Sequence, residues 1–130
     1  MINVESNFIV RQSILYMDAI EKAASLSKKI EICTSSFEDL NVKVQTMSFS
    51  PIDSEYITMN YLLFRAGRQS KQWVHVVISL FDYDGKIIQI GESVQFELKK
   101  RNLPYVGNVF IELKIPYDQI AKVGVYLQEC

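Results

Sequence analysis

Residues 73–98 read WVHVVISLFDYDGKIIQIGESVQFEL, and this stretch decides the fold. Apolar residues occupy every second position from Val74 to Leu80, and the opposite face of the same run is also largely apolar. A strand that is apolar on both faces is typical of a sheet covered on both sides. The Asp84-Gly85 step then predicts a hairpin turn, because glycine adopts positive φ at no steric cost. The period of two resumes from Ile88 to Leu98, which predicts a second and a third strand.

Two features of this stretch need a closer test. An EF-hand loop with Gly85 at its sixth position would have Leu80 first and Gly91 twelfth, and neither residue has a side-chain oxygen. The Asp-rich turn therefore predicts a hairpin and not a calcium site. The apolar series is interrupted at Gly91-Glu92, which a β-bulge or a change of sheet would explain.

The same alternation continues along the chain. It predicts seven strands, at residues 42–49, 56–65, 73–81, 86–90, 94–98, 109–115 and 122–128. Seven short strands separated by turn signals are typical of an antiparallel β-sandwich of immunoglobulin or fibronectin type. Trp73 opens the third strand, where such domains often keep a buried tryptophan. The apolar set shifts by one residue between Val44 and Met47, which predicts a bulge, and residues 99–107 predict a basic loop.

One family resemblance rests on the hairpin. The residues Ser79-Leu80-Phe81-Asp82-Tyr83-Asp84-Gly85-Lys86 resemble small bacterial immunoglobulin-like domains of the FxLYD type, in which a strand ends in an aromatic residue, an Asp and a Gly-Lys step. The resemblance covers one hairpin. It implies the immunoglobulin-like fold and implies no activity.

The first 40 residues differ from the rest. The spacing of three and four between apolar residues predicts a helix over about residues 10–28, with a stripe formed by Val10, Ile14, Met17, Ile20 and Ala24. The apolar runs at 8–10 and 14–16 leave a strand open as the alternative. Residues 29–32 suggest a short strand, and 35–38 have the spacing of a capping box and suggest one helical turn. The helix is expected to plug one end or edge of the sheets, or to dock a second copy or another protein.

Length and composition set further bounds. The chain has 130 residues and a formal net charge of −1, which predicts one domain over 1–130, with a helical segment 1–40 packed on a β-sandwich 41–130. Nothing in the charge balance points to nucleic acid or to an anionic membrane. The N-terminus has neither a secretory signal nor a membrane span, and the two cysteines, Cys33 and Cys130, make no disulfide framework. We therefore expect a cytoplasmic protein with reduced thiols.

The sequence contains no motif for catalysis, metal or nucleotide. Asp82 and Asp84 fall on an exposed turn, without the desolvated cleft that tunes catalytic acids. His75 is the only histidine, nothing local ties it to Cys33, and the five glycines make no phosphate cradle. We predict no cofactor and no enzymatic activity, and a small enzyme of unrecognised type remains a minor alternative.

Two readings of function follow. The first is a non-enzymatic protein-interaction or assembly module, for which we predict a homodimer with contacts from Val10, Ile14, Met17 and Ile20 or from an adjoining sheet edge. The second is a binding domain for a small anionic ligand, with basic loops at 65–71 and 99–101 meeting at one end of the sandwich. The residues of those loops are Arg65, Arg68, Lys71, Lys99, Lys100 and Arg101. An apolar patch on the helix or on a sheet edge would favour the first reading, and a closed pocket lined by Arg or Tyr the second.

Overall fold

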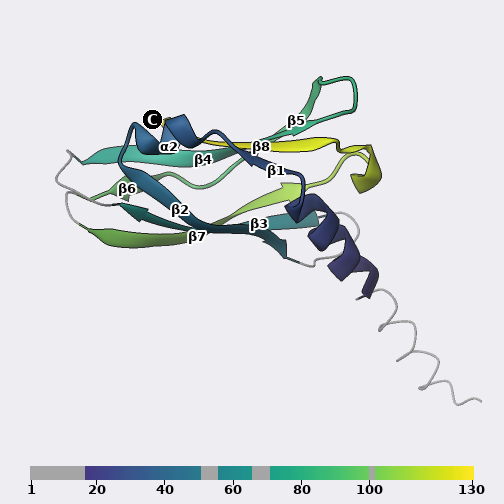
Figure 1. Ribbon diagram of the computed structural model, residues 1–130, viewed down its shortest axis with the longest axis horizontal. Coiled ribbons are helices and arrows are strands. Elements are labelled where there is room, and N and C mark those ends of the chain that lie inside the picture. Colours follow the sequence, from purple (N-terminus) through teal and green to yellow (C-terminus); the bar gives the residue numbers. More distant parts are fainter. Residues whose placement is uncertain (1–16, 51–55, 66–70, 100–101) are drawn as a thin grey trace, which may run out of the picture.

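The computed structural model describes residues 17–50, 56–65, 71–99 and 102–130, and it is mainly β, with two sheets and an N-terminal helix (Figure 1). Residues 17–27 are helical. The later elements are β1 (Ile30–Ile32), α2 (Thr34–Glu38), β2 (Val42–Ser50), β3 (Tyr56–Arg65), β4 (Gln72–Phe81), β5 (Ile87–Glu92), β6 (Phe96–Leu98), β7 (Leu103–Glu112), η1 (Tyr117–Gln119) and β8 (Lys122–Glu129). One sheet has the order β1-β8-β4-β5, with β6 pairing β4, and the other has the order β2-β3-β7.

The core lies between the two sheets. Four of the residues that alternation assigns to the interior are buried there, namely Val76, Ile78, Ile111 and Val125, and Phe96 packs against them while partly buried. β4 is the central strand, paired with β8 on one side and with β5 and β6 on the other. The inner face of β4 lies in the core, whereas on its outer face Val77 and Ser79 are buried and Trp73 is exposed.

The hairpin between β4 and β5 is confirmed. The backbone N–H of Asp82 donates to the carbonyl of Lys86 at 2.9 Å, and Gly85 has a φ of 81°. The carboxylate of Asp82 accepts from the backbone N–H of Asp84 and of Lys86, each at 2.9 Å. This carboxylate therefore closes the turn by hydrogen bonds to its own backbone.

Of the two expected irregularities, one is confirmed. A register shift between Val44 and Thr46 bends β2, at the predicted bulge. Gly91, in contrast, pairs regularly with Ile78, and the irregularity lies opposite the step from Leu80 to Phe81. Gly91 is required for another reason, because a Cβ there would lie 2.5 Å from Cγ1 of Ile111.

Several expectations need correction. Trp73 is 55% exposed on the outer face of β4, so it is not the buried tryptophan of an immunoglobulin core. β7 begins at Leu103 and ends at Glu112, where the sequence predicted a loop through 107 and a strand through 115. Pro104 is tolerated because β7 is an edge strand, and a proline at a sheet edge need not break a ladder bond. The pairing is also not wholly antiparallel, since β1 runs parallel to β8.

The helix at 17–27 closes one end of the molecule, as expected for part of the predicted helix. Ala23 and Leu26 face the core and are buried. The described part of the predicted stripe lies on the other side, because Met17 is 58% exposed and Ile20 is 37% exposed. The described helix is thus attached through a face that the sequence did not select, and Met17 and Ile20 face solvent.

Candidate functional site

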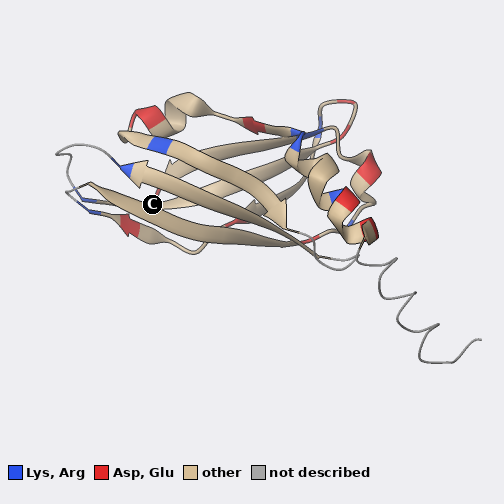
Figure 2. Cartoon of the chain, turned by 60° about the horizontal axis from the view of Figure 1, so that its bottom comes forward, with Lys and Arg blue, Asp and Glu red and all other residues tan. Residues whose placement is uncertain are grey.

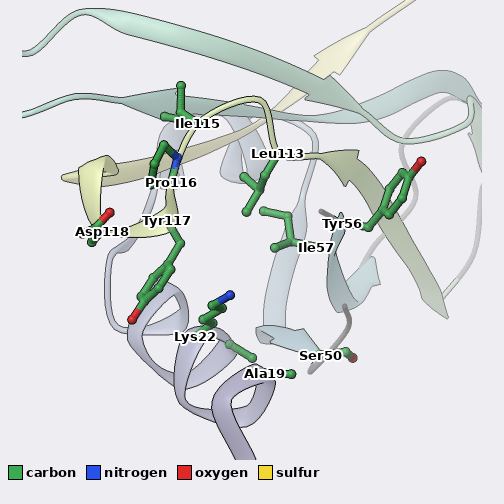
Figure 3. A pocket seen from close by; sticks show the side chains of 11 residues that line it. Ala19, Lys22, Ser50, Tyr56, Ile57, Leu113, Ile115, Pro116, Tyr117 and Asp118 are labelled. Carbon is green, nitrogen blue, oxygen red and sulfur yellow. The ribbon is translucent and has the colours of Figure 1, made fainter. Parts of the chain in front are cut away.

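A pocket of about 300 Å³ lies between the helix and the ends of the strands (Figure 3). Its floor is the small helix residues Ala19 and Ala23, and its far wall is Ile57 of β3 with Leu113 after β7. Two alanines on this face of the helix leave open the space that larger side chains would fill. The volume is at the lower end of the range of small-molecule sites, roughly 300–1,000 Å³.

Hydrogen bonds hold the walls of the pocket in place. Ser27 Oγ accepts from the backbone N–H of Phe49 at 2.9 Å and donates to the carbonyl of Ala23 at 2.7 Å, which fixes the helix to β2. Lys29 Nζ donates to the carbonyl of Ile120 at 2.7 Å, which fixes the turn before β8. The pocket is therefore bounded by elements that are tied to one another.

Lys22 and Tyr117 give this pocket its polar side. Lys22 Nζ lies 5.4 Å from the centroid of the Tyr117 ring and 3.3 Å from the carboxylate of Asp18. Figure 3 shows these two side chains across the pocket from Ile57 and Leu113. One cation beside apolar walls suits an anion with an apolar body, although Asp18 and Asp118, which also lines the pocket, offset that charge. Among the residues that the structure describes, no cluster of His, Cys, Asp and Glu could hold a metal ion.

The predicted anion contacts are only partly on the described surface. Arg65 is fully buried and donates from Nη1 to the carbonyl of Lys99 at 2.9 Å, so its guanidinium does not face an incoming anion. Lys71 and Lys99 are exposed at the same end, where Gln72 pairs with Leu98. Arg68, Lys100 and Arg101 lie outside the described residues. Anion binding by these loops stays a prediction.

The charge at this end is also partly neutralised. Lys99 Nζ contacts Glu97 Oε1 at 2.7 Å, and this hydrogen bond holds the pKa of the Glu97 carboxyl below its usual value, with a further contribution from the Lys71 charge. Figure 2 shows basic and acidic residues intermixed at both ends of the described chain. A surface of one sign, which would attract polyanions, is not formed by these residues.

Of the predicted dimer contacts, two lie outside the described residues and two lie on the described surface. Val10 and Ile14 lie outside the described residues. Met17 and Ile20 are exposed on the helix, away from the core. They are available for contacts, and the dimer itself stays a prediction.

Sequence reasoning missed the outer side of β7. Val106 is 81% exposed and Phe110 is 60% exposed, and the Phe110 ring stacks on Tyr56 with centroids 5.1 Å apart. The sequence contained a signal for this strand, because from 103 to 111 apolar residues occupy most positions of both strand faces. Pro104 and Gly107 concealed it, since both favour a loop.

The backbone of β7 is open on one side. Among the described residues β7 pairs only with β3. At its C-terminal end, the side chain of Gln89 donates to the carbonyl of Glu112 and accepts from the N–H of Lys114. The backbone groups of Glu112 thus point away from β3, and in an extended strand every second residue points the same way. Val106, Asn108 and Phe110 therefore direct their N–H and C=O groups to the open side. We call these three residues the β7 edge.

Comparisons with known proteins supply no identity. No family model matches the chain, and no curated protein matches its sequence. The crystal structure of Campylobacter jejuni cj0090 is similar with a TM-score of 0.39 at 8% identity, over 78% of this chain and 98% of that one. A putative β-galactosidase from Bacteroides fragilis is similar with a TM-score of 0.33 at 14% identity, over 68% of this chain and 15% of that one. Likeness at these TM-scores carries no argument about this chain. Within the described ranges, no helix has the length and apolar character needed to cross a membrane.

Proposed function

We propose that this protein is a non-enzymatic association module whose two facing sheets form an immunoglobulin-like β-sandwich, and that it assembles with a second copy of itself through the β7 edge. The observation that carries the proposal is an open strand edge flanked by two exposed apolar side chains, Val106 and Phe110. Unpaired strand edges are templates for pairing with another chain, and natural proteins usually protect them. Here the centre of the edge is unprotected.

The sequence of β7 is self-complementary about Asn108. In a two-fold antiparallel pairing centred on this residue, Val106 of each copy lies opposite Phe110 of the other, on the same face. The N–H and C=O groups of all three edge residues find partners. An apolar cross-strand pair then forms on each side of the axis.

Two positions of β7 cannot form every backbone hydrogen bond with a second copy, and in this pairing they lie opposite each other. Pro104 has no N–H to donate, and the carbonyl of Glu112 is occupied by Gln89. In the pairing centred on Asn108, Pro104 of one copy lies opposite Glu112 of the other. The pairing therefore loses little at its ends and cannot extend beyond them. Such a limited, symmetric edge favours a closed dimer over an unrelated strand or an open fibre.

The test is sedimentation at about 50 μM, well above a micromolar dissociation constant. We expect the wild type to be a dimer and Val106→Lys to raise the dissociation constant by at least tenfold, about 1.4 kcal/mol. Ile90→Lys is the matched control, because Ile90 is an exposed apolar residue, at 54%, on β5, where it lines a hollow with Phe81 and Lys122 that contains no β7 residue. It should leave the dimer intact.

Other outcomes would overturn the proposal. A monomeric wild type removes it. A dimer that Val106→Lys leaves unchanged places the contact elsewhere. Asn108→Pro tests the backbone directly, because it removes a donor on the open side only. A dimer that survives this change does not use the β7 edge.

A second candidate function is supported by the pocket of Figure 3. Lys22 beside apolar walls suits a small carboxylate with an aliphatic tail. Octanoate is a suitable probe. Stabilisation of the wild type against thermal unfolding, lost in Lys22→Met and retained in Lys28→Met at an exposed position after the helix, would support it. An unchanged melting temperature with octanoate would remove it.

A further inference from the structure

His75 and Cys130 meet on the outer face of the five-stranded sheet, although 55 residues separate them. The register of β4 and β8 brings them together, because His75 pairs with Gln128 and the backbone N–H of Cys130 donates to the carbonyl of Trp73 at 2.9 Å. Cys130 therefore continues the β8 ladder by one residue. Its position is set by the backbone and not by the side-chain contact alone.

The contacts of the His75 imidazole indicate which of its two ring nitrogens carries the proton. Nδ1 lies 3.2 Å from Sγ of Cys130, and Nε2 lies 3.1 Å from Oε1 of Gln128. The carboxylate of Glu92 lies 4.0 Å from the same Nε2. Both neighbours of Nε2 are oxygen atoms that only accept, so Nε2 carries the proton in the neutral ring. Nδ1 is then an unprotonated base that faces the thiol.

We propose that Cys130 is a site of thiol modification, at which the thiol reacts with small disulfides such as glutathione disulfide. A nucleophile beside a base that is oriented by a third group is the arrangement that activates cysteines. Cys130 is exposed, so a small disulfide reaches its thiol.

The step balances without a further reactant. Cys130 transfers its proton to Nδ1 of His75, and the thiolate attacks one sulfur of the disulfide. The new Sγ–S bond forms as the S–S bond of the reagent breaks, and the leaving thiolate takes the proton from the imidazolium. Cys130 is oxidised to a mixed disulfide and one glutathione is reduced.

Cys33 is a matched control within the chain. Its thiol is exposed as well, and its Sγ lies 3.6 Å from the hydroxyl of Ser35. The hydrogen bond from Ser35 lowers the pKa of the Cys33 thiol, so Cys33 is a demanding comparison. No imidazole accompanies it, since the only histidine contacts Cys130.

The experiment follows the formation of the glutathione adduct by intact-protein mass spectrometry at pH 7. Cys33→Ser leaves only Cys130, and Cys130→Ser leaves only Cys33. We expect Cys33→Ser to react about tenfold faster than Cys33→Ser with His75→Gln, because the thiolate is the reactive form. It should also react faster than Cys130→Ser. Equal rates with and without His75 would overturn the proposal.

Two further measurements guard against a folding defect. Folded Cys33→Ser should react faster than the same variant in denaturant, a comparison that leaves His75 in place. Gln128→Glu retains an acceptor for Nε2 and should keep or raise the rate, whereas Gln128→Lys removes the acceptor and should lower it. A folded thiol that reacts no faster than the unfolded one contradicts the proposal.

Discussion

At the scale of single residues, Ile78 reports on the core. It is fully buried in the middle of β4, between β8 and β5. Ile78→Ala should lower the free energy of unfolding by about 2–5 kcal/mol, because it removes buried methyl groups and leaves a cavity. Ile90→Ala, at a side chain 54% exposed, should cost less than about 0.5 kcal/mol. Chemical denaturation measures both, and a cost below about 0.5 kcal/mol at Ile78 would mean that the core is elsewhere.

Tyr61 predicts a loss of stability at alkaline pH. Burial raises the pKa of its phenol above 10, and a hydrogen bond with Ser93 opposes this in part. The unfolded chain then releases this proton at a lower pH than the folded one. The contribution of Tyr61 is therefore complete below pH 10 and is lost as the pH rises through the folded pKa.

Tyr61→Phe removes this titration. Between pH 7 and about pH 11, the variant should lose less free energy of unfolding than the wild type does. Tyr83→Phe, at a tyrosine 72% exposed in the hairpin turn, should retain the wild-type loss. Urea unfolding at the two pH values decides this, and an equal loss in the wild type and in Tyr61→Phe would contradict it.

Residue type alone misplaced Arg65 and Trp73. A charged residue suggests the surface and a tryptophan the interior, and both assignments depend on which face of a strand a residue occupies. Arg65 falls on the inner face at the end of β3, where the carbonyl of Lys99 receives its guanidinium. Trp73 falls on the outer face of β4. The alternation specified these faces correctly, so in both cases periodicity was a better guide than chemistry.

At the scale of elements, the helix has one face that packs on the core and another that exposes apolar side chains. Met17→Asp with Ile20→Asp places charges on the exposed stripe, away from Ala23 and Leu26. The circular dichroism spectrum and the two sheets should be unchanged. Because we propose association through the β7 edge, the dimer should also persist in sedimentation. Dissociation would transfer the interface to the helix, and collapse of the fold would show that the stripe belongs to the core.

The bounds of a strand were predicted well where loop-forming residues lie only at its two ends. β3 was predicted with its observed bounds, Tyr56 to Arg65, because loop residues flank a regular alternation. β7 was predicted six residues late, at 109 where it begins at Leu103, because Pro104 and Gly107 lie inside it. The presence of both residues within a strand is explained only by the three-dimensional structure. Pro104 occupies an edge, and at Gly107 a Cβ would lie 2.3 Å from the hydroxyl of Tyr61.

At the scale of the whole molecule, the thiols should not determine assembly. Cys33 and Cys130 are both free and exposed, and neither lies on β7. Replacing both by Ser should leave the sedimentation coefficient unchanged and the stability within about 0.5 kcal/mol. A wild-type dimer that reductant separates, together with a monomeric double variant, would refute this.

The type of most elements could be predicted, but the seven predicted strands omit the short β1, which the sequence only suggested at 29–32, and the strand partners could not be predicted. Alternation within a strand is local information, whereas pairing joins residues far apart in the chain. The parallel contact of β1 with β8 and the meeting of His75 with Cys130 are both of this second kind. The pocket and the His75–Cys130 pair consequently came from the structure, because each unites side chains of several elements, whereas the β7 edge lies on one strand and needed only the sheet order.

The position of β8 between β1 and β4 has a consequence for the order of events during synthesis. Ser36 Oγ accepts from the N–H of Leu127, and 91 residues of chain separate them. Until β8 leaves the ribosome, β1 has no neighbour and β4 exposes an apolar edge. Folding that depends on such non-local pairing is slow, on the order of milliseconds to seconds for all-β proteins. A nascent chain that stalls before residue 122 would therefore leave the β8-facing edge of β4 unpaired, although β5 and β6 precede β8 and pair with the other edge. This makes the late arrival of β8 the stage most exposed to aggregation and to chaperones.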